Sequence, residues 1–421
     1  MTQEEAELLM KSGRSILLTG AAGSGKTYLL EEFTKWARNE RKKVAVTATT
    51  GLAATNINGT TIHNWSGIGV HDQYQEHIVQ HMFPRYRNAI NGADILLIDE
   101  ISMLHDFRLD MVERIVREVR GKEEPFGGLQ VILSGDFFQL PPINGLEQRS
   151  GGFITESEIF KTGMFTVCYL DKIYRQIEGD ELNNILNSLR CNTFGPSQIE
   201  LLWARAHVNL DNDTVSELYC TNRGVDQRNQ EELDNLPGEA FFYTQQISGI
   251  NVNAKEELRR VCSAVPNLSL KNGAVVMFNK NDPHRHFFNG SLGKIVGFNS
   301  ERRPTVKLNN GRIEDVEPAE WYLEDGEGMR LATIWQLPLR LAWAITVHKC
   351  QGMTLDAARI DLSNAFVEGI GYVALSRVRS IKNLSLIGWN DMARRVSSKA
   401  LRLEQHLLDA SKEAQKSIYS G

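Results

Sequence analysis

The sequence predicts an α/β fold built on parallel β-sheets. Up to residue 172, short apolar runs of the kind buried on both faces of a sheet alternate with helical patterns. Val112, Ile115, Val116 and Val119, for example, are spaced as one face of a helix. A glycine-rich motif also joins the first apolar run to the first long helical pattern, as in phosphate-binding folds. The expected strands of this part are Ser15–Thr19, Val44–Ala48, Ile95–Ile98, Leu129–Leu133 and Phe165–Leu170.

The pattern changes twice further along the chain. From Ile173 it is helical and polar, with one expected strand at Leu218–Thr221. From Phe241 to Leu339, NG dipeptides, Gly and Pro break the chain into short alternating segments, which is typical of a small all-β unit. The α/β pattern then resumes, and Met392–Ser417 is expected to form a closing helix. We therefore expect a first domain at 1–172, a second domain at 173–245 and 340–421, and an inserted β domain at 246–339.

Composition narrows the class of protein. The chain has 421 residues, of which 42% are apolar, so it has enough apolar residues for several folded cores. The 47 Lys and Arg against 52 Asp and Glu give a net charge of 47 − 52 = −5, so any nucleic-acid site must be a local basic surface. No apolar run approaches the roughly 18 residues of a membrane span. The five cysteines show no metal-ligand spacing and are expected to be reduced thiols: Cys168, Cys191, Cys220, Cys262 and Cys350.

The strongest local signal is the phosphate loop GAAGSGKT at Gly20–Thr27. Backbone N–H groups of such a loop surround the β-phosphate of a nucleotide at the start of a helix. Lys26 is then expected to bridge the β- and γ-phosphates, and the Thr27 hydroxyl to bind Mg²⁺. The nucleotide-binding residues expected here are Gly23, Ser24, Gly25, Lys26, Thr27 and Tyr28.

Two further strands end in polar residues at the same edge of the expected sheet. Asp99 and Glu100 follow ILLI, where Asp99 is expected to hold Mg²⁺ and Glu100 to act as the base that activates water. Gln139 follows LQVILSGDFF and precedes two prolines, so its amide is expected near the γ-phosphate. The alternatives are a solvated acidic pair for Asp99 and Glu100, and a simple turn residue for Gln139.

The ordered motifs resemble those of superfamily 1 DNA helicases of the PIF type, relatives of RecD and of the phage Dda helicase. They are GAAGSGKT, TGLAATNINGTTIH, IDEISM, PFGGLQVILSGDFFQLPP, YRQ, QLPLRLAWAITVHKCQGMTLD and YVALSRVR, and they extend from Gln3 to about Trp389. The resemblance implies two RecA-like domains. It also implies a short wedge insertion at about 64–88 in the first domain and a small barrel of Src-homology-three type in the second.

The resemblance assigns further residues of the ATP site. Gln3 is expected to recognise adenine, and Gly352 to contribute to the nucleotide site. Arg175 and Arg377 are expected to reach the γ-phosphate from the second domain, where a guanidinium stabilises charge on the transferred phosphoryl group. The alternative for either arginine is an ordinary surface ion pair.

The resemblance also places a set of residues on or near a groove for single-stranded DNA. Backbone amides and small polar residues can bind phosphates there without reading sequence. His63 and Trp65 could stack on bases, or could simply pack in the core. A metal site at His71, His77 and His81 is a weaker interpretation, because no nearby Cys or Glu triad completes it. The expected DNA-binding residues are Thr50, Gly51, His63, Asn289, His348, Lys349 and Gln351.

The resemblance implies an ATP-dependent DNA helicase that moves 5′ to 3′ on single-stranded DNA and requires Mg²⁺. It is expected to be a monomeric motor at duplex junctions in replication, recombination or repair, with forks, G-quadruplexes and RNA–DNA hybrids as candidate substrates. We expect a cytoplasmic, nucleoid-associated protein of bacterial or phage origin. The main alternative is an ATP-switched remodeller of single-stranded nucleic acid that unwinds weakly. A P-loop ATPase that does not act on nucleic acid is disfavoured by the motif series.

Overall fold

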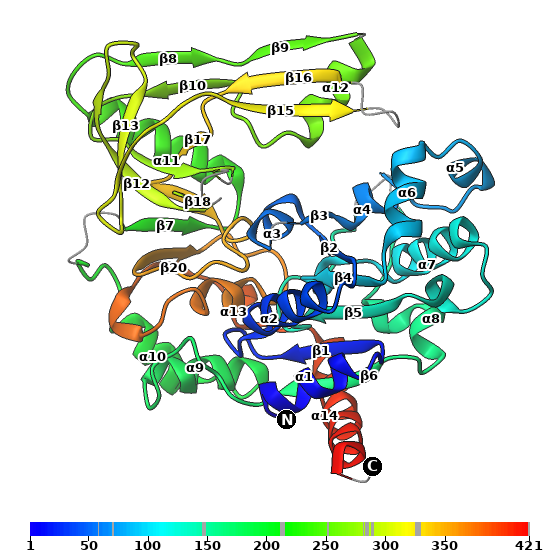
Figure 1. Cartoon of the computed structure of the whole chain (residues 1–421). Coiled ribbons are helices and arrows are strands. Elements are labelled where there is room, and N and C mark those ends of the chain that lie inside the picture. The colour runs from blue at the N-terminus through cyan, green and yellow to red at the C-terminus, as the bar shows by residue number, and fades with distance from the viewer. Residues whose placement is uncertain are drawn as a thin grey trace.

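The computed structural model describes residues 1–57, 59–69, 71–144, 149–210, 215–250, 252–280, 282, 286–287, 290–324 and 330–419. Within these ranges the chain forms two parallel sheets and three antiparallel sheets. The parallel sheets occupy the lower part of the molecule as drawn, and the antiparallel sheets lie above them (Figure 1). The predicted α/β class is confirmed.

The first unit contains a six-stranded parallel sheet in the order β3-β2-β4-β5-β1-β6. Five of these strands were predicted, each with its ends within two residues. The missed strand, β3, has only two residues, too few to show a pattern. The bounds are β1 Ile16–Gly20, β2 Val44–Ala48, β3 Thr60–Thr61, β4 Ile95–Asp99, β5 Gln130–Gly135 and β6 Thr166–Leu170.

The helices of this unit fill the connections between its strands. The amphipathic helix α7 buries its apolar face, including Val112, Ile115 and Val116, and is capped by Gly121 in the left-handed conformation. The bounds are α1 Gln3–Lys11, α2 Lys26–Asn39, α3 Gly51–Asn56, α4 Ile62–Trp65, α5 Glu76–Gln80, α6 Pro84–Gly92, α7 Asp106–Arg120 and α8 Glu158–Lys161, with short 3₁₀ turns η1 Ile101–Met103, η2 Pro125–Gly128 and η3 Ile154–Glu156.

The second unit contains a four-stranded parallel sheet in the order β18-β7-β19-β20. The closing helix starts at Ser398 rather than Met392, because Asn390 caps a separate 3₁₀ turn and Arg395 is extended. The bounds are α9 Glu181–Arg190, α10 Pro196–Trp203, β7 Ser216–Tyr219, α11 Asn222–Asn235, β18 Ala344–Thr346, β19 Ala358–Leu362, α13 Ile370–Leu375, η4 Ile381–Asn383, β20 Leu384–Trp389, η5 Asp391–Arg394 and α14 Ser398–Tyr419.

The antiparallel strands lie in the chain between β7 and β18, in the orders β14-β13-β12-β11-β17, β15-β16-β9 and β10-β8. They start at Phe241 and end at Leu341, a few residues outside the range 246–339. Helix α12 interrupts the expected all-β pattern, burying Ala254 and Leu258 beside Ile334. The bounds are β8 Phe241–Thr244, β9 Gln246–Gly249, α12 Val252–Val261, β10 Asn267–Leu270, β11 Val275–Phe278, β12 Leu292–Phe298, β13 Pro304–Leu308, β14 Ile313–Asp315, β15 Ala319–Glu324, β16 Arg330–Gln336 and β17 Leu339–Leu341.

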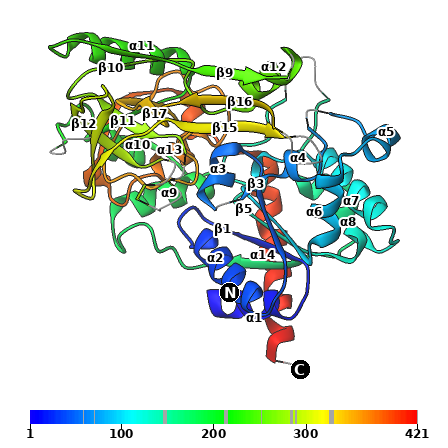
Figure 2. The ribbon, with the colours of Figure 1, turned by 45° about the horizontal axis from the view of Figure 1, so that its top comes forward.

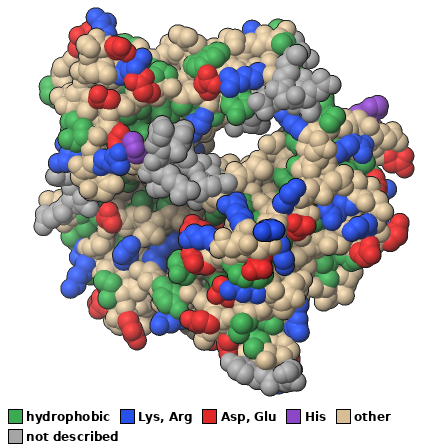
Figure 3. All heavy atoms as spheres, in the orientation of Figure 1, with side chains coloured by type: hydrophobic (Ala, Val, Ile, Leu, Met, Phe, Trp, Pro, Cys, Tyr) green, Lys and Arg blue, Asp and Glu red, His purple; other side chains and the backbone are tan. Residues whose placement is uncertain are grey.

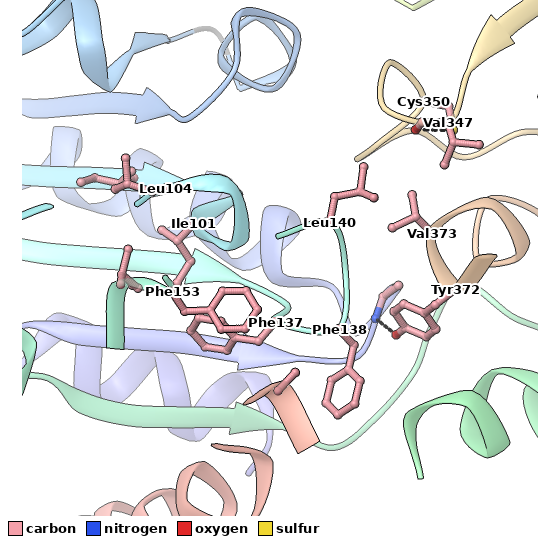
Figure 4. Packing of buried hydrophobic residues seen from close by; sticks show 14 of the residues in the cluster. Ile101, Leu104, Phe137, Phe138, Leu140, Phe153, Val347, Cys350, Tyr372 and Val373 are labelled. Carbon is pink, nitrogen blue, oxygen red and sulfur yellow. Dashed lines mark hydrogen bonds between the residues drawn. The ribbon is translucent and has the colours of Figure 1, made fainter. Parts of the chain in front are cut away.

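The largest hydrophobic core joins the two α/β units. Phe138 from the first unit packs against Tyr372 from the second, with ring centroids 6.5 Å apart (Figure 4). The closing helix α14 also crosses back to the first unit, where Ser411 accepts a hydrogen bond from the backbone N–H of Tyr169 on β6 at 2.9 Å. In the space-filling view an opening separates the antiparallel sheets from the first unit (Figure 3).

Candidate functional site

The phosphate loop lies between β1 and α2, and its geometry requires glycine. Gly23 and Gly25 have φ values of 85° and 83°. A Cβ atom on Gly23 would lie 2.5 Å from Cβ of Arg175, and one on Gly25 would lie 2.1 Å from Nε2 of Gln3. The side chain of Lys26 folds over the loop, where Nζ donates to the carbonyl oxygen of Gly20 at 2.8 Å. The loop is therefore closely packed by residues that the sequence assigned to ATP.

Polar and aromatic side chains surround the other side of this loop. Nε2 of Gln3 lies 3.3 Å from the carbonyl oxygen of Ser24. Tyr174, which follows β6, donates its backbone N–H to the carbonyl oxygen of Gly23 at 2.8 Å and is 52% exposed. Tyr28 on α2 is 60% exposed. Within the YRQ motif only Arg175 was predicted to have a role. Tyr174 was missed, although it stands in the same motif.

The carboxylates that follow β4 lie at the same edge of the sheet. Asp99 is buried, and burial together with the nearby Glu100 raises the pKa of its carboxyl group to about 7. Glu100 has a φ of 54°. Its Oε2 accepts a hydrogen bond from Nε2 of Gln351 at 3.0 Å. The structure thus joins the expected base to a residue that had been expected to contact DNA.

Cationic groups from both units converge near this edge. Burial lowers the pKa of Lys26 in spite of the surrounding carboxylates. Burial, together with the neighbouring charge of Arg377, lowers the pKa of Arg175 to about 9. Arg377 is 1% exposed and donates to carbonyl oxygens of its own unit, including that of Cys350 at 3.3 Å. Within the part of the chain that the structure describes, neither arginine forms an ion pair. Cations held in this way would be stabilised by an anion placed among them.

Several buried polar atoms in the same region have no hydrogen-bond partner among the residues that the structure describes. They are Oγ of Ser24 and the amide oxygens Oε1 of Gln139, Gln176 and Gln351. Gln139 is 5% exposed and lies in the turn after β5. Such orphaned groups mark places where a ligand or water is expected to complete the hydrogen bonding. They fit a polar, multiply hydrogen-bonded molecule such as a nucleotide.

A magnesium ion also fits the residues present. Thr27, the second residue of α2, and Asp99, which ends β4, offer one hydroxyl and one carboxylate. Mg²⁺ in nucleotide sites typically takes one or two protein oxygens and receives its other ligands from phosphates and water. Within the described residues no group of three or more His, Cys, Asp or Glu side chains is arranged to hold a metal ion.

A buried polar network lies behind the phosphate loop. Nη1 of Arg190 lies 2.8 Å and 3.0 Å from the two carboxylate oxygens of Asp136, and 3.0 Å from the hydroxyl of Tyr372. That hydroxyl also accepts the backbone N–H of Ala22 and lies 3.0 Å from Asp136. Nη2 of Arg190 reaches Glu404 on α14 at 2.7 Å. Asp136 and Tyr372 stand in quoted motifs, but Arg190 has no such signal and was missed.

A cavity of about 840 Å³ lies between the exit loop of β5 and the second unit. Its lining includes Asn144, Asn222, His348, Lys349 and Phe366. The rings of His348 and Phe366 are nearly parallel, with centroids 6.0 Å apart. Burial lowers the pKa of Lys349, and the nearby Arg340 lowers it further. Two of the expected DNA-binding residues, His348 and Lys349, therefore share one cavity.

The other expected DNA-binding residues lie elsewhere. Thr50 and Gly51 stand at the start of α3, where Oγ1 of Thr50 accepts the N–H of Ala53 at 3.2 Å. His63 is partly buried and lies 2.8 Å from Nη1 of Arg108, and Trp65 is buried in the core. For Trp65 the packing alternative is therefore confirmed.

The remaining expected positions are Asn289, Gly352 and the wedge range 64–88. Asn289 lies outside the residues that the structure describes. Gly352 directly follows Gln351 and has a φ of 80°. The range of the expected wedge contains α5 and parts of α4 and α6, on the side of the molecule toward which β15 and β16 extend (Figures 1 and 2).

Among the described residues no helix is both long and apolar enough to cross a membrane.

Comparison with known proteins decides the family. Residues 4–191 match the PIF1-like helicase family. The ATP-dependent DNA helicase Pif1 of Psychrobacter sp. (strain PRwf-1) is 37% identical, over 99% of this chain and 72% of that protein. The chain belongs to the PIF1-like helicase family. Its enzyme class is therefore that of the ATP-dependent DNA helicases.

Solved structures of PIF1-like helicases agree with this assignment. The crystal structure of Pif1 from Candida albicans has a TM-score of 0.88 and 32% identity, covering 96% of this chain and 98% of that one. The crystal structure of Bacteroides Pif1 bound to single-stranded DNA has a TM-score of 0.74 and 29% identity, with 97% of each chain covered. The chain spans 63% of the length of the human relative, which is 34% identical over 95% of this chain.

Proposed function

We propose that this PIF1-like helicase hydrolyses ATP between its two α/β units and uses the cycle to translocate 5′ to 3′ along single-stranded DNA. The observation that carries the proposal is the meeting of Lys26, Arg175 and Arg377 with Asp99 and Glu100 at one sheet edge. The cations come from both sides of the interface, and the pKa values of Lys26 and Arg175 are lowered by burial. The direction of movement rests on the family resemblance.

Each residue of the site has a specific role in this proposal. The loop amides and Lys26 bind the β- and γ-phosphates, and Gln3 orients the adenine. Glu100 accepts a proton from the attacking water, while Gln139 contacts the γ-phosphate. Arg175 and Arg377 stabilise the charge that develops on the transferred phosphoryl group. Because these arginines connect to the second unit, the phosphate state is transmitted to the relative position of the units.

Magnesium is included in the proposal as the counterion of the phosphates. Thr27 and Asp99 would hold it, and its chemistry there is to neutralise the phosphate oxygens and orient them. The raised pKa of Asp99 agrees with a buried carboxyl group that would be stabilised as a carboxylate by a cation.

The DNA side of the proposal is carried by the shared cavity. Lys349 offers a phosphate a positive charge, and the paired rings of His348 and Phe366 offer bases a flat surface. Thr50 and Gly51 are proposed as further contacts with the strand. The single-stranded DNA bound to the related Bacteroides protein supports this substrate class. We propose a monomeric motor at duplex junctions in replication, recombination or repair of bacterial or phage DNA, with G-quadruplexes and RNA–DNA hybrids as further substrates.

The proposal is tested by ATPase assays with and without single-stranded DNA. The wild type is expected to hydrolyse ATP faster when a strand is added, and removal of Mg²⁺ by a chelator to stop hydrolysis. Glu100→Gln is expected to bind ATP but to lose turnover by about 10²-fold or more, because the base is gone while the phosphate contacts remain. An ATP hydrolysis rate that does not change when DNA is added would contradict the assigned roles. So would wild-type turnover in Glu100→Gln.

A further inference from the structure

The proposed catalytic base is held by a side chain from the other unit. Glu100 follows β4 of the first unit, whereas Gln351 follows β18 of the second. Their 3.0 Å hydrogen bond therefore crosses the interface between the units. Gln351 is 5% exposed, and among the described residues its Oε1 has no hydrogen-bond partner. One end of this buried amide thus binds the base, and the other end is free to accept a hydrogen bond.

Gln351 belongs to a compact turn. The backbone N–H groups of Lys349 and Cys350 both donate to the carbonyl oxygen of Thr346, at 3.0 Å and 3.1 Å. Nη1 of Arg377 lies 3.3 Å from the carbonyl oxygen of Cys350 and 3.3 Å from that of Met353. Because hydrogen bonds hold the turn together from within and from Arg377, a shift at one of its residues is expected to move the others.

The same turn contributes residues both to the strand cavity and to the contact with Glu100. Thr346, His348 and Lys349 line the cavity assigned to the DNA strand. Gln351 is not among the residues that line this cavity, and its amide contacts Glu100 instead. Only two positions of the chain separate Lys349 from Gln351. The turn therefore links the strand cavity to the hydrogen bond that holds the proposed base.

We propose that Gln351 is a positioning residue that orients Glu100 and makes this orientation depend on strand binding. This role rests on the proposed function and replaces the expected direct contact between Gln351 and DNA. The side-chain N–H of Gln351 fixes the carboxylate of Glu100, and the side-chain Oε1 accepts an O–H of the attacking water. A strand that binds Lys349 moves the turn, and the turn carries Gln351 with it.

The test is the ATPase of Gln351→Met, measured while an oligothymidine strand is titrated. Methionine has a similar size but cannot donate the hydrogen bond. We expect kcat at saturating strand to fall by about tenfold, because small errors in the placement of a catalytic group cost this much or more. We expect the KM for ATP and the half-saturating strand concentration to stay within about twofold of the wild type, since the phosphate and strand contacts remain.

Further variants separate positioning from other effects. Gln230→Met makes the same change on α11, where Gln230 contacts only Asp234 in the described hydrogen bonds, and is expected to behave as the wild type. Lys349→Ala is expected to raise the half-saturating strand concentration. Gln351→Glu keeps the size of the side chain but sets a carboxylate against Glu100, so it is expected to lose kcat at least as strongly as Gln351→Met. In a Glu100→Gln background, Gln351→Met is expected to add little further loss, because the two residues act as one unit.

These measurements separate a failure of the Gln351 role from a failure of the proposed function. Unchanged kcat with weaker strand binding in Gln351→Met would overturn the proposal and return Gln351 to direct DNA contact. Equal losses of kcat in the single variant and in the Glu100→Gln background would show independent action and also overturn it. If Gln351→Met is unfolded, seen as the loss of its thermal transition, the same measurements on Gln351→Glu decide the question. A wild type without strand-stimulated ATPase would contradict the proposed function itself, before this role is reached.

Discussion

The hydroxyl group of Tyr372 accepts the backbone N–H of Ala22 at 2.9 Å. Tyr372 lies on α13 of the second unit, and Ala22 lies in the phosphate loop of the first. The same hydroxyl lies 3.0 Å from Asp136, and the Tyr372 ring packs near Phe138 (Figure 4). The loop that is proposed to bind phosphate is thus fixed directly to the second unit.

Tyr372→Phe tests the importance of this contact. The ring remains to fill the core, but the N–H of Ala22 and the Asp136 carboxylate lose a partner. We expect the free energy of unfolding to fall by about 1 to 3 kcal/mol, as for other buried groups left unsatisfied. We also expect a several-fold lower kcat/KM for ATP, because the loop is less well ordered. Urea denaturation and steady-state ATPase check both, with Tyr322→Phe at an exposed position as the control. Wild-type values for both quantities would show that the bond has no role.

The Arg190–Asp136 pair gives a second prediction, on stability. Burial alone would raise the pKa of Asp136, but the charges of Arg190 and Lys26 outweigh burial and hold this pKa below its ordinary value. Arg190→Met leaves the Asp136 carboxylate without its main partner. We expect a loss of about 3 to 5 kcal/mol in the free energy of unfolding.

Adding Asp136→Asn to Arg190→Met is expected to restore part of that loss, because the unpaired charge is then removed. Equilibrium denaturation of both variants measures the difference. If the double variant is less stable than Arg190→Met by the full effect of Asp136→Asn alone, the pair is not coupled and the interpretation fails.

His63 gives a prediction on pH. Burial, together with the charge of Arg108, lowers the pKa of its imidazole from 6.5 to about 4. The folded protein therefore binds this proton less readily than the unfolded chain, so stability falls as the pH drops from about 6.5 toward 4. At about 1.4 kcal/mol per pKa unit, the contribution lost at pH 5 is up to about 2 kcal/mol. His63→Gln removes the titrating group, so urea denaturation at pH 7 and pH 5 should show a smaller difference for this variant. An unchanged difference would mean that His63 does not carry the effect.

The parallel sheets and the phosphate-loop site were predictable because both depend on local sequence. Apolar runs such as Val44–Ala48 mark strands buried on two faces, and GAAGSGKT specifies a loop conformation that only glycine allows at Gly23 and Gly25. Polar residues at strand ends, such as Asp99, must then meet at one edge. These inferences need no knowledge of contacts between distant segments.

Relationships between the units were not predictable in this way. The contact between Gln351 and Glu100 joins residues 251 positions apart, and that between Tyr372 and Ala22 joins residues 350 apart. Arg190 ends an ordinary amphipathic helix, and nothing local distinguishes it from a surface arginine. Helix α12 was missed because the turn signals on both sides of it favoured strands.

The central claim is that this chain is an ATP-driven motor that moves 5′ to 3′ and separates strands. The most direct measurement is ATP-dependent unwinding of two duplexes of identical sequence, one with a 5′ single-stranded tail and one with a 3′ tail, with Lys26→Ala as the control. We expect unwinding of the 5′-tailed duplex alone, and none by Lys26→Ala, which loses the phosphate contact but should still bind the strand. Unwinding from the 3′ tail alone would contradict the direction, and strand-stimulated ATPase without any unwinding would contradict the motor and favour an ATP-switched remodeller.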